Sequence, residues 1–191
     1  MEAIILIILV AYSIILHEIA HGYVAYKLGD PTAKVYGRLT LNPLAHIDPI
    51  GTIILPLMTF FFGGFIFGWA KPVPYNPYYF RNPKRDSKLV GLAGPLVNFC
   101  LAILFSMIIK FNPLPNLYDV FLTLIRINFL LAVFNLLPIP PLDGSRLYLP
   151  SLPLNLQIYL ENIGFILIFF ALFFLWPIIR TIVDFLMNIF I

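Results

Sequence analysis

The chain has 191 residues, of which 61% are hydrophobic and only 11% charged, with a formal net charge of +3 and a mean hydropathy of +0.94. A composition this apolar, with runs near the 20 residues that cross a bilayer, excludes an ordinary soluble domain and indicates an integral membrane protein. The basic residues lie beside apolar segments, where they orient a chain in the membrane, so we expect no nucleic-acid partner, and the single Cys100 excludes an internal disulfide framework.

The first predicted element is a helix over residues 3–28, which starts as an almost unbroken apolar run and stops at Gly29-Asp30-Pro31. No basic stretch precedes this helix and no small-residue cleavage site follows its apolar part. We therefore expect it to remain in the mature protein rather than to be removed as a signal peptide.

Three polar side chains interrupt this helix in the motif HEIAH, residues 17–21. Because helical positions four apart share a face, His17 and His21 can bind one metal ion, and Glu18, about 100° round the helix, can reach a water on that ion. A strongly polar group in mid-membrane costs about 2.5–3.5 kcal/mol, so such a cluster needs a partner that holds it. The motif predicts a metal site, and the alternative is a polar cluster that packs helices together.

The motif lies closer to one end of its helix than to the other. Lys27 follows His21 by about 9 Å along the axis, whereas Ala3 precedes His17 by about 21 Å. By the positive-inside rule the Lys27 end faces the cytoplasm. We therefore expect the site inside the cell membrane but nearer the cytoplasmic side.

After the helix the hydrophobic period changes. In KVYGRLTLN, residues 34–42, apolar and polar side chains alternate, which predicts a short half-buried strand or hairpin. His46 and Asp48 follow in the next loop, where they could support a metal site or add a fourth ligand. A simple turn before Pro49 explains Asp48 almost as well.

Residues 50–70 are apolar enough to span, but Pro56 and Gly63-Gly64 interrupt them and basic residues flank both sides. We therefore expect a broken or re-entrant segment enclosed by protein. A cytoplasmic loop is predicted over residues 71–88, which are polar and rich in proline.

Further helices are predicted over residues 89–110 and 117–137, joined by a tight return at 111–116, and a helical region over 155–190 completes the chain. The fold class is thus an all-α membrane protein, a polytopic bundle of transmembrane helices with a short membrane-associated β-hairpin and a broken segment. One intramembrane domain covers the whole chain, residues 1–191.

A catalytic metal site needs a third protein ligand. Asp143, in the motif LDG at residues 142–144, follows a helix that returns to the side of the histidines, and the prolines before it bend the backbone so that its carboxylate can point inward. We select Asp143 over the other acidic residues, and the alternative is an ordinary turn Asp before Gly144.

HEIAH at 17–21, AGPLVNF at 93–99 and NLLPIPPLDG at 135–144 occur in this order on membrane segments. With these motifs, and over roughly residues 8–150, the chain resembles the site-2 proteases, intramembrane zinc metalloproteases, and in particular their compact prokaryotic branch. No stretch corresponds to the PDZ or CBS domains of some members. The resemblance implies one zinc ion on His17, His21 and Asp143, with Glu18 as general base.

The resemblance also implies that Asn98 and Asn135 lie near the substrate, although both could be amides that only pack helices. The chemistry of such a site is hydrolysis of a peptide bond by zinc-activated water. We expect transmembrane segments of other membrane proteins as substrates, held by β-addition to residues 34–42, with membrane lipid around the chain. The sequence fixes no oligomeric state, and a zinc transporter or a non-catalytic scaffold for membrane helices are the two alternatives.

Overall fold

The computed structural model describes residues 1–63, 68–111 and 115–191. Within these ranges the chain is helical and contains no strand. Among the described residues, four helices are long and apolar enough to cross a membrane: α1 (Glu2–Lys27), α4 (Pro83–Phe111), α5 (Tyr118–Asn135, preceded by a 3-10 turn from Pro115) and α6 (Leu154–Phe174). The chain is therefore a multi-pass membrane protein.

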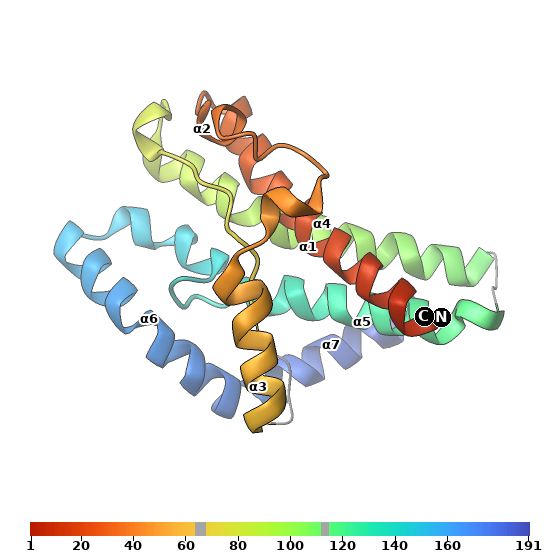
Figure 1. Cartoon of the computed structure of the whole chain (residues 1–191). Coiled ribbons are helices and arrows are strands. Elements are labelled where there is room, and N and C mark those ends of the chain that lie inside the picture. Colours follow the sequence, from red (N-terminus) through yellow and green to blue (C-terminus); the bar gives the residue numbers. More distant parts are fainter. Residues whose placement is uncertain (64–67, 112–114) are drawn as a thin grey trace.

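Helices α1, α4 and α5 pack along one another and form the centre of the bundle (Figure 1). Helix α7 (Trp176–Phe190) packs on α5, and α6 stands apart from the three central helices. Pro177, the second residue of α7, has no backbone N–H with which to continue α6, so α6 ends at Phe174 and the chain turns back.

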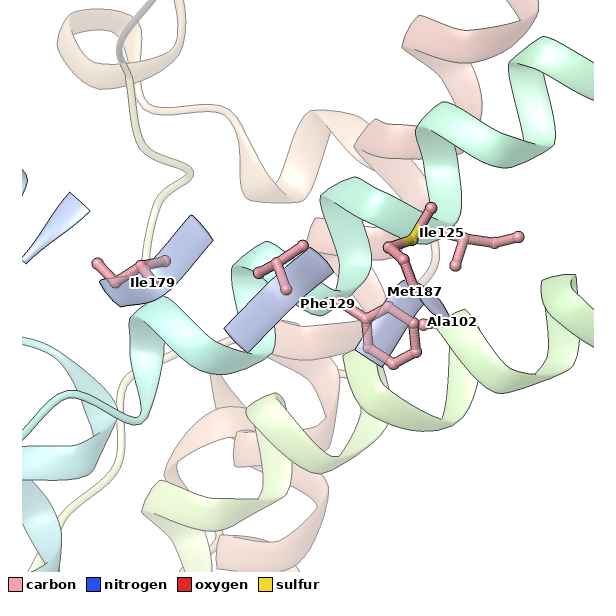
Figure 2. Close-up of a cluster of buried hydrophobic side chains, with 6 residues drawn as sticks. Ala102, Ile125, Phe129, Ile179 and Met187 are labelled. Carbon is pink, nitrogen blue, oxygen red and sulfur yellow. The ribbon is translucent and has the colours of Figure 1, made fainter. Parts of the chain in front are cut away.

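The largest apolar cluster joins α4, α5 and α7 (Figure 2). Phe129 of α5 is fully buried between Ala102 of α4 and Met187 of α7. Since lipid tails are as apolar as these side chains, close packing rather than transfer from water holds such an interface, and a small residue such as Ala102 lets the backbones approach.

The predicted strand over residues 34–42 is wrong. A short helix, α2 (Thr32–Val35), occupies its start, and Gly37 at φ +64° then turns the chain out of the extended region. The alternation places Arg38 on the polar, outward face of the expected strand. In the structure Arg38 is buried, and its guanidinium donates to the carbonyls of Ala45, Lys71 and Pro72. The need to satisfy this buried cation outweighs the period-two pattern.

The segment expected to be broken begins as a π-helical turn (Pro49–Ile54) and continues as α3 (Leu55–Gly63). The chain then returns to the beginning of this segment, where the Trp69 backbone N–H donates to the Gly51 carbonyl at 3.0 Å. Residues 64–67 of this segment, with Gly64, lie outside the described residues, as do residues 112–114 of the expected return at 111–116.

Helix α4 begins at Pro83, inside the range expected as a loop. The Asn82 side chain accepts from the Arg85 N–H at 3.2 Å, and the Asp86 carboxylate accepts from the Asn82 N–H at 3.0 Å. This reciprocal cap, with proline in the first turn, is a typical helix start. The high proline content of the region led to the prediction of a loop instead. The chain before it, from Gly68 to Asn76, contains no helix or strand.

Candidate metal centre

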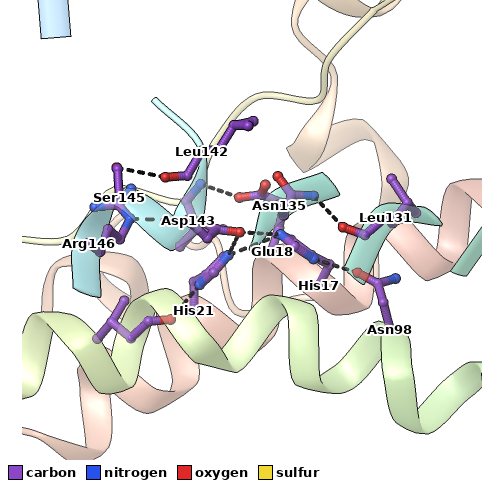
Figure 3. A network of polar contacts seen from close by, with 12 residues as sticks. His17, Glu18, His21, Asn98, Leu131, Asn135, Leu142, Asp143, Ser145 and Arg146 are labelled. Carbon is purple, nitrogen blue, oxygen red and sulfur yellow. Dashed lines mark hydrogen bonds and ion pairs between the residues drawn. The ribbon is translucent and has the colours of Figure 1, made fainter. Parts of the chain in front are cut away.

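Two histidines of α1 and one aspartate after α5 meet inside the bundle (Figure 3). The Nε2 atoms of His17 and His21 lie 3.1 Å apart. Asp143 Oδ2 lies 3.1 Å from His17 Nε2 and 3.2 Å from His21 Nε2. All three side chains are buried, so the sequence prediction that Asp143 reaches the HEIAH helix agrees with the geometry.

The backbone around Asp143 explains how its carboxylate reaches the histidines. Gly144 lies against the C-terminal end of α5, where a Cβ atom would come within 2.2 Å of the Leu136 carbonyl oxygen. Only glycine fits this close approach. The Ser145 hydroxyl donates to the Leu142 carbonyl at 2.7 Å and closes the turn that carries the carboxylate.

Hydrogen bonds behind the two rings fix their orientation. His17 Nδ1 lies 2.5 Å from Asn98 Oδ1, and His21 Nδ1 lies 2.7 Å from the Val90 carbonyl oxygen. Both oxygens are acceptors, so each Nδ1 carries the proton and donates it, which leaves both Nε2 lone pairs directed toward Asp143.

A buried amide network holds Asn98 in place. The Asn98 Nδ2 donates to Asn128 Oδ1 at 2.9 Å, and the Asn128 Nδ2 donates to Ser13 Oγ at 3.1 Å and to the Leu124 carbonyl at 2.9 Å. Asn98 and Asn128 have no exposed surface. Inside a bilayer such groups are tolerated because they satisfy one another.

Helix α4 can lie close to the histidines because the positions that face the cluster are glycines, which have no side chain. A Cβ atom on Gly94 would come within 2.4 Å of His21 Nε2 and 2.6 Å of His17 Nε2. A Cβ on Gly91, one turn earlier, would come within 2.9 Å of the Asp143 carbonyl oxygen. These two glycines leave the room that the cluster needs.

The donor set fits a zinc ion. Zinc bound tetrahedrally at 2.0–2.1 Å places its ligand atoms about 3.3 Å apart, and the three observed separations are 3.1, 3.1 and 3.2 Å. Two imidazole nitrogens and one carboxylate oxygen also form the ligand set of catalytic rather than structural zinc sites, which keep a fourth position open for water.

Glu18 lies beside this cluster without joining it. Its Oε2 accepts a 2.8 Å hydrogen bond from the backbone N–H of Val73, in the extended stretch after Trp69. Gly22, one turn further along α1, lets Val73 come this close, since a Cβ there would lie 2.7 Å from Val73 Cγ1. Glu18, Asp143 and both histidines line one pocket of about 500 Å³.

Of the remaining predicted residues, Asn135 lines the same pocket, and its side chain donates to the Leu131 carbonyl at 3.0 Å. His46 and Asp48 lie outside the group of ligand atoms. His46 Nε2 donates to the Thr40 carbonyl, and Asp48 accepts from the Trp69 indole and the Ile50 N–H. These bonds to the ionised carboxylate lower the pKa of Asp48.

Arg146 is a residue of the site that the sequence analysis missed. Its Nε lies 3.7 Å from Asp143 Oδ1, its Nη1 donates to the Tyr75 hydroxyl, and its guanidinium lies 4.6 Å from the centre of the Tyr75 ring. An arginine three residues after a predicted ligand was the available signal, because it lies one helical turn away. Asn128 and Ser13 carried no comparable signal in the sequence.

The profile of peptidase family M50 matches residues 5–116, more than half of the chain. The chain is similar to "Putative zinc metalloprotease YwhC" of Bacillus subtilis (strain 168), with 38% identity over 97% of this chain and 90% of that relative. It is also similar to "Putative zinc metalloprotease Rip2" of Mycobacterium tuberculosis (strain ATCC 25618 / H37Rv), with 34% identity over 86% of this chain and 64% of that relative.

A third similar protein is "Zinc metalloprotease MJ0392" of Methanocaldococcus jannaschii, with 30% identity over 75% of this chain and 33% of that relative. No solved structure matches the chain. The profile covers more than half of the chain, and the Bacillus relative aligns with nearly all of it. The chain therefore belongs to peptidase family M50, the site-2 proteases, and is an enzyme of the zinc metalloprotease class.

Proposed function

We propose that this protein is an intramembrane protease that holds one zinc ion on His17, His21 and Asp143 and hydrolyses peptide bonds within or near transmembrane segments of other membrane proteins. The observation that carries the proposal is the convergence of these three side chains, with their donor atoms 3.1–3.2 Å apart, on helices apolar enough to span a bilayer. The Lys27 end of α1 is the cytoplasmic end, by the positive-inside rule.

Zinc, when bound, polarises the scissile carbonyl and lowers the pKa of its water toward neutrality. Glu18 is the general base: its carboxylate takes a proton from the attacking water and returns it to the leaving amine. The Val73 N–H bond holds that carboxylate in the shared pocket. Asn98 and the Val90 carbonyl keep the imidazoles in the tautomer that binds metal through Nε2.

The substrate lies between two walls of the pocket. Trp69, Val73 and Tyr75 of the extended stretch form one wall, and residues of α5 and α6, among them Asn135 and Phe165, form the other. A substrate helix must unwind here, because helical carbonyls are already hydrogen-bonded within the helix. Asn135 is placed to offer its amide to the freed backbone groups, whereas residues 34–42 contain no strand to which a substrate could add.

The test uses the purified protein in lipid vesicles with two designed single-pass substrates, one with a uniform leucine-rich segment and one with Asn-Gly in its middle. We expect cleavage inside the segment, faster for the interrupted substrate, with fragments identified by mass spectrometry. Glu18→Gln should lower the rate at least about a hundredfold while zinc stays bound, as elemental analysis would show.

Three results would each contradict a different part of the proposal. A scaffold would bind both substrates and cut neither, and Glu18→Gln would change nothing. A transporter would carry zinc into the vesicles without fragments appearing. Equal cleavage of the uniform and interrupted segments would reject the requirement for unwinding.

A further inference from the structure

A second pocket, of about 590 Å³, adjoins the one that contains the candidate metal centre. The two pockets share Tyr75, Pro141 and Arg146 in their walls. The second pocket lies toward the Lys27 end of the bundle: Pro77 and Tyr78 line it, and the carbonyl of the next residue, Tyr79, packs against Gly29 just after α1. The second pocket thus lies next to the metal centre on the side of the Lys27 end.

One face of α6 lines both pockets. Phe165 and Ile168 face the pocket of the metal centre, and Gln157 and Glu161 face the second pocket. These positions are spaced by three or four residues and so form a single stripe along the helix. The stripe is apolar beside the metal centre and polar toward the Lys27 end, which is the polarity profile of a transmembrane segment followed by its flank.

Glu161 is the unusual member of this stripe. It lies about 10 Å from the start of a helix that is apolar enough to span the bilayer. Among the described residues it has no hydrogen bond and no ion pair. A carboxylate at such a position is costly without a partner and marks a functional site by default. The other strong charge in the pocket, Arg146, is already engaged by Asp143 and Tyr75.

From these observations we propose that the second pocket binds the cytoplasmic flank of the substrate, and that Glu161 receives a Lys or Arg side chain of that flank. This inference rests on the proposed protease function and names a feature of its substrates. Flanks on the cytoplasmic side of membrane helices carry an excess of Lys and Arg, so charge complementarity favours this occupant. Glu161 is thus a specificity-determining residue outside the group that holds the metal.

A charge exchange tests the pairing in lipid vesicles. The interrupted substrate is made with three Lys, three Gln or three Glu residues in its cytoplasmic flank. We expect the wild type to cut the Lys flank about tenfold faster than the Glu flank. Glu161→Lys should invert this order, and Glu161→Gln should reduce the preference. Tyr159→Lys is the matched control, because Tyr159 is also exposed but lies about 200° round α6 from Glu161 and is not among the residues that line either pocket, so the wild-type order should persist.

A crosslinking experiment detects substrate binding in the absence of catalysis. In a protein carrying Cys100→Ala and Glu18→Gln, a cysteine is placed by Glu161→Cys or, as control, by Tyr159→Cys, and substrates carry one cysteine in the flank. We expect a disulfide with the cysteine at position 161 and none at position 159.

The outcomes separate the two proposals. If the wild type cleaves all three flanks equally fast and crosslinking is equal at both positions, the proposed subsite is rejected and the proposed protease function is not. Crosslinking at position 161 without cleavage by the wild type supports the subsite and rejects the protease.

Discussion

The backbone N–H of Val73 donates a 2.8 Å hydrogen bond to the carboxylate of Glu18, although 55 residues separate them in the chain. This bond ties the extended stretch before α4 to the candidate general base. The same stretch is fixed at other points, because Arg38 donates to the Lys71 carbonyl and the Asn76 N–H donates to Asp30. Its position over the pocket is therefore set by several partly buried hydrogen bonds.

Val73→Pro removes the N–H donor while keeping an apolar side chain. We expect the cleavage rate to fall about tenfold, because a carboxylate without its charge-assisted bond is no longer held toward the pocket. The zinc content, measured by elemental analysis, should stay unchanged. Val73→Ala keeps the N–H and is the control. A rate for Val73→Pro equal to that of Val73→Ala would show that the bond is not used in turnover.

Gly94→Ala places a methyl group within 2.4 Å of His21 Nε2 and 2.6 Å of His17 Nε2. Neither imidazole can retreat without leaving Val90 or Asn98, so we expect both zinc binding and cleavage to be lost. Leu96→Ala, on a half-exposed position of the same helix, is the comparison and should keep its zinc. Full zinc occupancy in Gly94→Ala would mean that α4 does not approach the histidines this closely.

More of the candidate site than of the fold could be predicted from the sequence. The spacing of His17 and His21 fixes one helix face, and Asp143 follows from the prolines and glycine around it. The observed Nε2–Oδ2 distances of 3.1 and 3.2 Å agree with that expectation. Local rules suffice here because a buried metal cluster needs particular side chains at particular spacings.

The prediction of a strand over residues 34–42 was wrong because an alternation of nine residues carries no information about the tertiary contacts of the segment. Val35, expected to be half-buried, is 77% exposed, and Arg38, expected to face outward, is 7% exposed. The carbonyls that accept hydrogen bonds from the Arg38 Nη atoms belong to residues 45, 71 and 72, and no local sequence pattern predicts such contacts. Asn128 was missed for the same reason, since its partners Asn98 and Ser13 lie on other helices.

Asp143→Ala tests the proposed ligand that comes from the second half of the chain. We expect zinc occupancy after dialysis to fall far below that of the wild type, because two histidines alone do not form a closed ligand set. Asp143→Glu keeps a carboxylate one methylene further out and should retain part of the zinc. Asp48→Ala, a carboxylate outside the cluster, should bind zinc as the wild type does. Equal occupancy in Asp143→Ala and Asp48→Ala would remove Asp143 from the site.

Asn98→Leu tests the amide network behind His17. The substitution removes the acceptor of His17 Nδ1 and also leaves the Asn128 carbonyl oxygen without its donor. We expect zinc affinity to fall about 10- to 100-fold, since partners behind metal-bound histidines have effects of this size. We also expect the unfolding free energy in detergent to drop by about 1–3 kcal/mol, the cost of a buried polar group left unpaired.

The double variant Asn98→Leu with Asn128→Leu separates these two effects. Replacing both amides removes the orphaned group, so the loss of stability should be smaller than the sum for the two single variants. The loss of zinc affinity should persist, because His17 Nδ1 still lacks its acceptor. Among the described residues the Asn135 amide is hydrogen-bonded only to its own helix, so Asn135→Ala should leave zinc affinity unchanged. If the double variant regained wild-type zinc affinity, the orientation of His17 would not depend on Asn98.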